Sequence, residues 1–371
     1  MSAATHAELG ITDKTITLGQ SAAFEGPASA LGLGMRLGLN AAFEEANSNG
    51  GVHGRTLELI SYDDGYESEK AIANTKKLIE NDKVFALIGA VGTPTSKAAQ
   101  PVAKKADVPF IGPFTGAGFL RDPDNSHVIN VRGSYDQETE AWVKHLTEDV
   151  GAERIAILYQ DDSFGRAGLS GVEKAMQSRG MELVAKGTYQ RNTTAVKTAL
   201  LTIRKAKPDA VVMVGAYKPI AEFIKLAKRV RMQSTFVTIS FVGSKALSKE
   251  LGNSGEGVVI TQVVPMPEDS SIPLIADYHS ALKAIDADAK PGFVSLEGYM
   301  VGRLMVQAMR NIKGDLNREA LIASFGKTGT FDLGGVQLEY GASDNQGMDK
   351  VYMSVIQSDG SFEYVNKLNE S

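Results

Sequence analysis

The chain has 371 residues, with 39 Lys or Arg against 44 Asp or Glu, so its formal net charge is −5. Hydrophobic residues make up 43% and charged residues 22% of the chain, which excludes a disordered or collagen-like protein. At ~150 residues per domain, this length predicts two or three domains, or one large one. The acidic balance without a Lys/Arg block argues against nucleic-acid binding. No apolar run reaches the ~18 residues of a membrane span, and the absence of cysteine excludes disulfides and thiolate chemistry.

The amino terminus, Met1–Ala7, is small and polar. It lacks the basic start and the apolar core of a secretory signal. Either the protein is cytosolic, or a signal sequence has been removed and Met1 was added in its place.

Short β-branched runs alternate with segments of helical spacing through the first 263 residues. A stripe of apolar residues at every third or fourth position predicts the first helix, and a second helix is expected over Ser68–Asn81. Such alternation predicts parallel sheets with helices on both faces. The stripe is Leu31, Met35, Leu39, Phe43 and Ala46. The expected strands are Thr15–Leu18, Thr56–Tyr62, Val84–Ile88, Phe110–Ile111, Val128–Val131, Arg154–Tyr159, Glu182–Gly187, Ala210–Val214, Thr235–Thr238 and Val258–Val263.

The pattern changes in the last third of the chain. Two helices are expected over Ile275–Ile285 and Val294–Met309, without a strand between them. Four final runs predict a meander, namely Thr330–Leu333, Val336–Tyr340, Val351–Gln357 and Ser361–Val365. A single sheet of about ten parallel strands is near the upper limit for an open sheet. We therefore predict an α/β fold with two doubly wound lobes rather than an eight-stranded barrel.

A glycine-rich segment, Gly26–Gly34, superficially resembles a nucleotide loop. It does not match G-x-G-x-x-G, because Leu37 stands at the third glycine position. Gly32 and Gly34 also fall inside the first helix, where small residues permit close packing. Dinucleotide binding is not expected.

The segment Gly89–Ser96 follows a strand and opens a helix, but it lacks the lysine of a phosphate loop. Thr93 is the predicted N-cap and Pro94 the first helical residue. Free N–H groups of Thr95 and Ser96, with the two threonine hydroxyls, would suit a ligand carboxylate. A helix that is merely capped by its own threonine is the simpler alternative.

A second loop, Gly112–Gly118, follows the next strand. Its glycines allow the backbone to approach a ligand and Thr115 adds a donor, although the same string also fits an ordinary turn. Both loops lie at the carboxyl ends of neighbouring parallel strands, where open α/β sheets bind ligands. We expect the binding site there.

Catalytic and metal-binding motifs are missing from the sequence. The five histidines form no H-E-x-x-H pair, and no G-x-S-x-G elbow is present. The acidic pairs Asp63-Asp64 and Asp161-Asp162 lack calcium-loop spacing. We therefore expect neither an enzyme nor a cofactor.

Seven segments, in chain order, resemble the periplasmic solute-binding proteins of the leucine/isoleucine/valine-binding family, which deliver ligands to ABC importers. These segments are Thr15–Gly19 through Gly26-Pro27, Asn47–Arg55, Ile88-Gly89 with Thr93, Pro109–Pro113, Asp161–Gly165, Gly215–Pro219 and Gly255–Val258.

The resemblance implies the type I periplasmic binding protein fold, in which two lobes joined by three crossovers close on a ligand. The crossovers would fall near Arg132–Ser134, Val264–Pro267 and Tyr340–Asp349. Lobe 1 would comprise residues 13–132 plus 266–342, and lobe 2 residues 133–264 plus 348–371. A periplasmic monomer without a cofactor is expected, with an ABC permease and a small carboxylate ligand as its partners.

The resemblance also implies the site residues. The carboxylate-binding hydroxyl falls on Thr93, with backbone contacts around Phe114, Thr115 and Gly116. Leu31 covers the ligand with Glu25 close by, Phe164 and Tyr217 form an aromatic wall, and Tyr135 and Asp136 lie at the cleft floor.

One departure concerns the ligand's ammonium group. The family's acidic partner for that group falls on Ser240 here, and a buried ammonium without a carboxylate is poorly stabilised. Either Glu25, Asp136 or Asp161 replaces it, or the ligand has no α-amino group. Gly116 also stands where amino-acid binders have a threonine or serine. An amino acid and an aliphatic or aromatic acid thus both remain open, and a ligand-sensing subunit of a signalling system is the alternative role.

Overall fold

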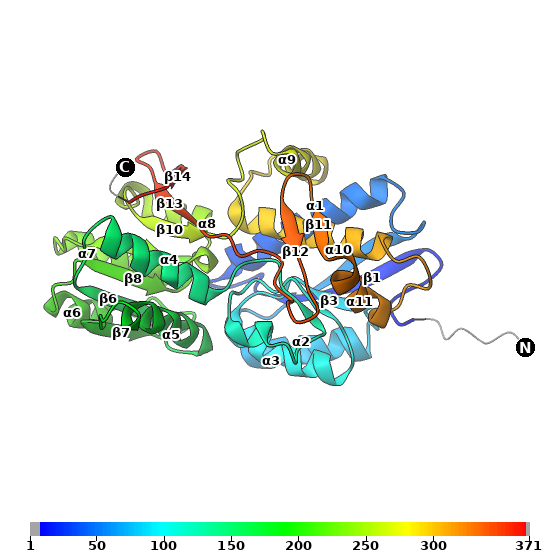
Figure 1. Ribbon diagram of the computed structural model, residues 1–371, viewed down its shortest axis with the longest axis horizontal. Coiled ribbons are helices and arrows are strands. Elements are labelled where there is room, and N and C mark those ends of the chain that lie inside the picture. The colour runs from blue at the N-terminus through cyan, green and yellow to red at the C-terminus, as the bar shows by residue number, and fades with distance from the viewer. Residues whose placement is uncertain (1–7, 369–371) are drawn as a thin grey trace, which may run out of the picture.

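The computed structural model describes residues 8–368 (Figure 1). The amino-terminal segment Met1–Ala7 lies outside the described residues, so the expectation about a signal sequence is not addressed. The described chain forms two α/β lobes side by side, each on its own sheet, with an additional two-stranded hairpin. Within residues 8–368, no helix has the length and apolar character that a bilayer crossing requires.

The first sheet has five parallel strands in the order β2-β1-β3-β4-β5. These strands are β1 (Thr15–Ala22), β2 (Thr56–Asp63), β3 (Ala86–Ile88), β4 (Phe110–Ile111) and β5 (Val128–Ile129). The lobe also contains α1 (Ser29–Ser48), α2 (Ser68–Glu80), α3 (Thr93–Lys105), α9 (Pro273–Ile285), α10 (Phe293–Arg310) and α11 (Arg318–Thr328). Helix α1 packs against α9 and α10, and α2 packs against α3. The strand order reverses between β1 and β3, so ligands are expected beside that point.

The second sheet repeats this arrangement in the order β7-β6-β8-β9-β10, again parallel, and then adds β13 and β14 antiparallel. The strands are β6 (Ile155–Gln160), β7 (Ala185–Tyr189), β8 (Ala210–Val214), β9 (Thr235–Thr238), β10 (Val259–Gln262), β13 (Tyr352–Ile356) and β14 (Phe362–Val365). Its helices are α4 (Tyr135–Glu148), α5 (Ser163–Gln177), α6 (Lys197–Lys205), α7 (Tyr217–Arg229) and α8 (Ser244–Leu251). The predicted α/β fold with parallel sheets is confirmed.

The expected four-stranded meander at the end of the chain is wrong. Strands β11 (Thr330–Asp332) and β12 (Gln337–Glu339) pair only with each other, while β13 and β14 extend the second sheet. Residues 340–351 separate the two pairs and carry the chain from one lobe to the other. A tight glycine turn can join two strands locally, but this longer segment leads β13 to a different sheet.

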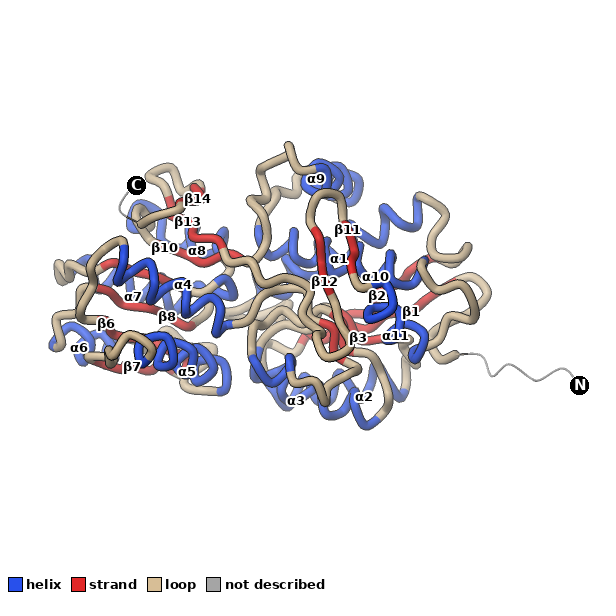
Figure 2. The backbone as a smooth tube through the Cα atoms, viewed as in Figure 1, coloured by secondary structure: helices blue, strands red, loops and turns tan. Residues whose placement is uncertain are grey.

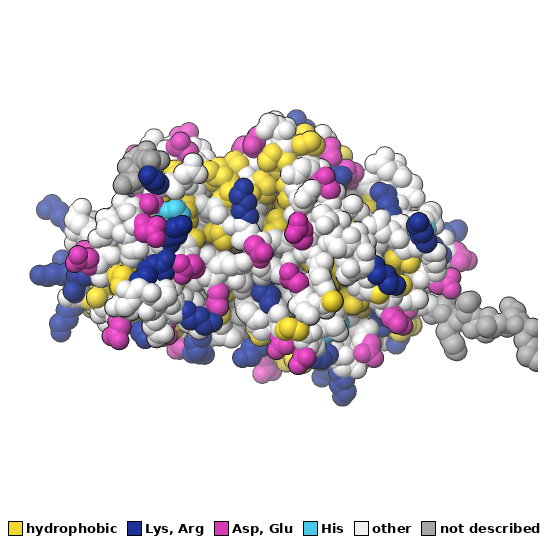
Figure 3. Space-filling model, viewed as in Figure 1, with side chains coloured by type: hydrophobic (Ala, Val, Ile, Leu, Met, Phe, Trp, Pro, Cys, Tyr) yellow, Lys and Arg dark blue, Asp and Glu magenta, His cyan; other side chains and the backbone are white. Residues whose placement is uncertain are grey.

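The chain passes between the lobes three times. It does so between β5 and α4, between β10 and α9, and between β12 and β13, and each passage is a loop in Figure 2. The residue boundaries given above for the two lobes stay a prediction. On the face drawn in Figure 3, apolar side chains gather between α9 and the β13–β14 pair, while charges of both signs are scattered elsewhere.

The core follows the predicted helical stripe. All five residues of that stripe are buried in α1. Gly32 allows α1 to approach β1 closely, because a Cβ atom at this position would collide with the carbonyl oxygen of Ala23. The interpretation of this segment as a packing helix rather than a nucleotide loop agrees with that contact.

Candidate functional site

The residues that follow the carboxyl ends of the strands meet between the two lobes. The strands of both sheets have the doubly wound order. Residues that follow their carboxyl ends make contacts from one lobe to the other. The ring of Phe114, after β4, lies 5.3 Å from that of Phe241, after β9. Backbone N–H of Ala30, after β1, donates to the Tyr217 hydroxyl, after β8, at 3.3 Å. We call this region, where the carboxyl edges of both sheets meet, the interlobe cleft, because α/β sheets bind ligands at such edges.

Two threonines and one tyrosine from three elements meet in this cleft. The Oγ1 atoms of Thr93 and Thr115 are 2.7 Å apart, and both residues are buried. Burial raises the pKa of Tyr135, whereas Arg132 and the hydroxyls of Thr115 and Thr93 lower it, so these groups are neighbours. The Tyr135 hydroxyl is buried and has no hydrogen-bond partner, although the two threonine hydroxyls are close to it. It therefore remains available to donate to a ligand.

Local structure explains why Tyr135 occupies this position. Ser134 caps α4, since its Oγ accepts the N–H of Gln137 at 3.2 Å and the Gln137 side chain accepts the N–H of Ser134 at 2.6 Å. This capping box starts the helix at Tyr135, one residue beyond the first crossover. The backbone N–H of Tyr135 also donates to the carbonyl of Gly116 at 2.8 Å.

The start of α3 corrects one detail of the sequence interpretation. The N-cap is Gly92, with φ of 104°, so Thr93 is the first helical residue instead of the cap. The N–H of Ser96 donates to the Gly92 carbonyl at 3.0 Å, and the Thr95 hydroxyl donates to the carbonyls of residues 91 and 92. The Ser96 N–H and the Thr95 hydroxyl are therefore not available to an anion. Because glycine tolerates this positive φ, the helix begins one residue earlier than it would with Thr93 as the N-cap.

Arg132 is a buried cation in the first crossover, with 0% of its surface exposed. Its guanidinium carbon lies 4.7 Å from the centre of the Phe114 ring. Nη2 donates to the Ser240 hydroxyl, and Nε lies 3.3 Å from a carboxylate oxygen of Glu297. Neither Nε nor Nη1 has a hydrogen-bond partner. Buried charged donors without partners are costly, which is typical of a site that a ligand completes.

Two buried glutamates flank this arginine. Glu138 accepts hydrogen bonds from the backbone N–H of Ser240 at 2.9 Å, from the Ser240 hydroxyl at 2.8 Å and from Thr261 Oγ1 at 2.5 Å. Burial raises the pKa of Glu138, and it raises the pKa of Glu297 to about 7 despite the nearby Arg132. Ser240 is thus part of a buried polar network in place of the expected acid.

Aromatic side chains of both lobes form the apolar part of the cleft. The ring of Phe241 lies 4.6 Å from Phe164, 5.3 Å from Phe114 and 6.0 Å from Tyr66. The ring of Tyr135 lies 5.5 Å from Phe164. All five rings are almost fully buried. The cleft therefore pairs a cluster of polar donors with an apolar wall, as a small amphipathic ligand requires.

Leu31 and Tyr217 lie together at one side of this wall. Both are buried, and a Cβ atom at Gly243 would lie 2.6 Å from Leu31 Cδ2 and 3.7 Å from Tyr217 Cδ1. The structure thus brings together the predicted residues Leu31, Thr93, Phe114, Thr115, Gly116, Tyr135, Phe164, Tyr217 and Ser240.

Three acidic residues considered for an ammonium group do not enter the cleft. Asp136 pairs with Lys174 at 2.7 Å and Asp161 pairs with Arg166 at 2.9 Å, and all four side chains are at least half exposed. Glu25 is exposed as well. These exposed positions do not favour the alternative in which one of the three replaces the missing acid, and that alternative stays a prediction.

An ion pair joins the two lobes. Glu67 precedes α2 in the first lobe and accepts from Arg191 Nη2 and from the Asn192 amide, both at 2.7 Å. Arg191 also reaches Asp162, the N-cap of α5, at 3.1 Å. We call these contacts the interlobe latch.

Sequence reasoning missed Tyr66, Arg132 and Phe241 as cleft residues. Tyr66 and Phe241 each follow the carboxyl end of a strand, so their position could have indicated them. Arg132 was recognised only as part of a crossover, and no local pattern distinguishes it from an exposed arginine.

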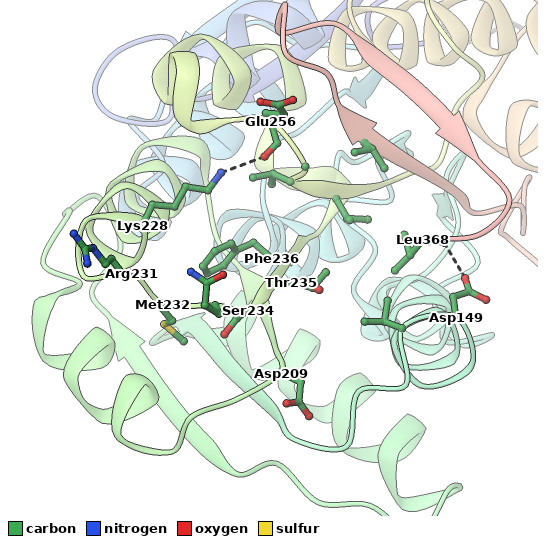
Figure 4. Close-up of a pocket in the computed structure, with 16 residues that line it drawn as sticks. Asp149, Asp209, Lys228, Arg231, Met232, Ser234, Thr235, Phe236, Glu256 and Leu368 are labelled. Atoms are coloured by element: carbon green, nitrogen blue, oxygen red, sulfur yellow. Dashed lines mark hydrogen bonds between the residues drawn. The ribbon is translucent and has the colours of Figure 1, made fainter. Parts of the chain in front are cut away.

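A large cavity lies elsewhere, at the amino ends of the second sheet's strands (Figure 4). It measures about 790 Å³ and is lined by residues such as Asp209, Thr235 and Glu256. Asp209 accepts from the backbone N–H groups of Glu153 and Arg154, and Lys228 donates to the Glu256 carbonyl at 3.1 Å. Its polar groups serve the loops around it, and it faces away from the carboxyl edge where the cleft residues converge.

Comparisons with known proteins agree with this architecture. A family model described as "Periplasmic binding protein" matches residues 15–361. A Leu/Ile/Val-binding protein homolog of Brucella abortus is 23% identical over 313 residues, which cover 81% of this chain and 78% of the relative. The crystal structure of a possible leucine/isoleucine/valine-binding protein from Rhodopirellula baltica is 39% identical, with a TM-score of 0.90 and coverage of 95% and 96% of the two chains. A substrate-binding periplasmic protein from Ralstonia solanacearum is 26% identical, with a TM-score of 0.88 over 94% of this chain and 100% of that one. The resemblance to this group is confirmed: the chain belongs to the periplasmic binding protein family, whose members are substrate-binding proteins of transporters and not enzymes.

Proposed function

We propose that this protein captures a small carboxylate-bearing ligand between its lobes in the periplasm and presents it, as a monomer, to an ABC permease. The observation that carries the proposal is the buried cluster of Thr93, Thr115 and Tyr135, in which the tyrosine hydroxyl has no partner. Hydroxyl donors in a buried site bind a carboxylate strongly because the bond is charge-assisted.

Closure of two lobes provides the capture step. A ligand favours the closed state only if it contacts both lobes, since it shifts an equilibrium by its differential affinity. Thr93, Thr115 and Phe114 come from the first lobe, whereas Tyr135 and Phe164 come from the second. A ligand held by the hydroxyls and covered by the rings would touch both.

The remaining site residues fit the same role. Leu31 and Tyr217 would cover the apolar part of the ligand, Gly116 would leave room beside the tyrosine ring, and Ser240 would hold the arginine in place. The proposed lobes are residues 13–132 plus 266–342 and residues 133–264 plus 348–371. Names such as Leu/Ile/Val-binding protein among the relatives support a branched aliphatic or similar apolar side group.

A ligand screen followed by one substitution tests the proposal. Purified protein is first screened by thermal shift against amino acids, aromatic acids and short fatty acids, because a ligand selective for the folded state raises Tm. Titration calorimetry of the hit with Thr93→Val should then show affinity lost by ~1–3 kcal/mol, since a charge-assisted hydrogen bond disappears. Lys97→Gln, an exposed position on the same helix, serves as the matched control. Unchanged affinity in Thr93→Val would remove the anchor from the proposal.

A further inference from the structure

We propose that the ligand is an apolar monocarboxylic acid that lacks an α-ammonium group, with Arg132 as the counter-ion of its carboxylate. This inference rests on the proposed function and names the class of ligand. It is carried by the position and the unpaired Nη1 donor of Arg132, by the unpaired hydroxyl of Tyr135, and by the contacts that already occupy the acids around them.

The unpartnered polar atoms around Arg132 and Tyr135 can each donate a hydrogen bond. Nη1 of Arg132 and the hydroxyl of Tyr135 are buried here without a hydrogen-bond partner, whereas Nε of Arg132 faces Glu297 at 3.3 Å. Each carries a hydrogen that a ligand oxygen can accept. A carboxylate brings two oxygens with about four acceptor sites, which matches an arginine and a cluster of hydroxyls.

An ammonium group would find no comparable partner. Glu138 is occupied by three donors from Ser240 and Thr261, and Glu297 is the neighbour of Arg132 at 3.3 Å. Asp136 and Asp161 are exposed and paired on the surface. A buried ammonium would therefore lie beside the Arg132 guanidinium without a free carboxylate to neutralise it.

The charge balance of the hinge favours an anion as well. Arg132 is fully buried there, and the half-buried Arg121 donates to the Arg132 carbonyl at 2.8 Å. Opposite them stand Glu138 and Glu297, and the pKa of Glu297, raised to about 7 by burial, reduces its negative charge near neutral pH. One buried and one half-buried cation therefore face less than two full negative charges, which favours an anionic ligand.

The rest of the ligand is apolar because the aromatic wall of the cleft is apolar. The side chains of Phe114, Phe164 and Phe241 contain only carbon and hydrogen. The Phe241 ring lies 5.3 Å from the Phe114 ring and 4.6 Å from the Phe164 ring. Polar substituents in this region would lose hydration without gaining a partner. Aromatic and branched aliphatic acids both satisfy this condition.

Matched ligand pairs provide the test. Leucine is compared with isocaproate and phenylalanine with hydrocinnamate, because the members of each pair differ only by the α-ammonium group. Titration calorimetry of the intact protein should show that at least one of the two acids binds, and at least about tenfold more tightly than its amino acid. The two pairs separate an aliphatic from an aromatic source of the same chemistry.

Two variants complete the test. Arg132→Gln should weaken binding of the acid by at least about tenfold. It should also reduce the ratio of the affinity for the acid to the affinity for the matching amino acid. A general loss of stability would not change that ratio. If Arg132→Gln does not fold, Tyr135→Phe keeps the ring contacts and removes only the unpaired hydroxyl, and it should weaken binding of the acid several-fold.

The outcomes separate this inference from the proposed function. Equal or tighter binding of leucine or phenylalanine, dependent on Thr93, would overturn the inference and leave the proposed function intact. Failure of both acids and both amino acids to bind would overturn the inference, and failure of the whole carboxylate panel would overturn the proposed function too.

Discussion

The ring of Tyr135 occupies the space in which a side chain at position 116 would lie. A Cβ atom on Gly116 would be 2.6 Å from Cδ1 of that ring and 2.7 Å from its backbone nitrogen. This explains why only glycine fits at position 116. In the proposed site, Tyr135 contributes its hydroxyl beside this glycine.

Gly116→Ala should therefore disturb both folding and binding. The added methyl group must displace the tyrosine ring or the backbone of α4, which costs roughly 1–3 kcal/mol of unfolding free energy. Urea denaturation measures the stability and calorimetry the affinity. Gly118→Ala is the control, because a Cβ atom there meets nothing within 4 Å. Equal stability of the two variants would contradict the explanation.

The interlobe latch predicts a kinetic effect. Glu67→Gln removes the ion pair with Arg191 and weakens the contact with Asn192. Because the carboxylate is 44% exposed, the effect should be small, with ligand dissociation faster by roughly two- to fivefold. Stopped-flow dissociation measures it. The matched control is Glu140→Gln, which breaks a pair with Arg179 inside the second lobe; a similar acceleration there would show that the latch has no special role.

The pH dependence of stability has a predicted contribution from Asp64. Burial raises its pKa from 3.8 to about 6, so the folded protein holds this proton more tightly than the unfolded chain. The contribution of Asp64 to the free energy of unfolding is complete below pH 4 and is lost as the pH rises through 6. Asp64→Asn removes this loss of stability at high pH, and the amide can retain the hydrogen bonds with Ser21 and the Tyr66 N–H. It should be more stable than the parent by roughly 2–3 kcal/mol at pH 7, but not at pH 4.

The neighbouring Asp63 gives the opposite sign and serves as the control. Burial alone would raise its pKa, but the backbone N–H groups of Phe24, Glu25 and Gly65 outweigh it, and the pKa is lowered. Asp63→Asn should therefore destabilise the protein at pH 7, with a difference that shrinks on acidification. Urea denaturation at the two pH values tests both variants; a gain for Asp64→Asn that is independent of pH would contradict the assignment.

The single tryptophan should report ligand binding. Trp142 Nε1 donates to Thr261 Oγ1 at 3.1 Å, and Thr261 donates to Glu138, which also accepts from Ser240. Through Ser240, this network reaches Arg132. A carboxylate that binds Arg132 should change the field at the indole and shift its fluorescence. Fluorescence titration measures the shift, and Thr261→Val should reduce it. An unchanged spectrum at ligand saturation would show that the network is insensitive to the site.

The aromatic wall gives a prediction about closure. Phe241 contacts rings from both lobes, Phe114 and Tyr66 on one side and Phe164 on the other. Phe241→Leu removes these ring contacts and should cost about 1–2 kcal/mol of ligand affinity. Small-angle scattering should show a larger open fraction of the unliganded variant. Phe325→Leu, a ring that packs within the first lobe against Phe331 and Tyr340, should leave the affinity unchanged.

Much of the fold could be predicted from the sequence because strands and helices follow local periodicity. The runs Ala210–Val214 and Thr235–Thr238 coincide with β8 and β9, and the apolar stripe of α1 is buried as expected. The loops Gly89–Ser96 and Gly112–Gly118 are predicted as site elements because they follow neighbouring parallel strands, and their role in binding stays a prediction.

Only the tertiary structure decided which distant residues meet. It placed the last four strands in two different sheets, since pairing depends on the path of residues 340–351 and not on strand propensity. It also brought Arg132 to Ser240 and Phe114 to Phe241, and it turned Asp136 toward solvent. Burial of a charge or a ring is a property of the closed arrangement of two lobes, and one-dimensional spacing contains no information about which faces of those lobes come into contact.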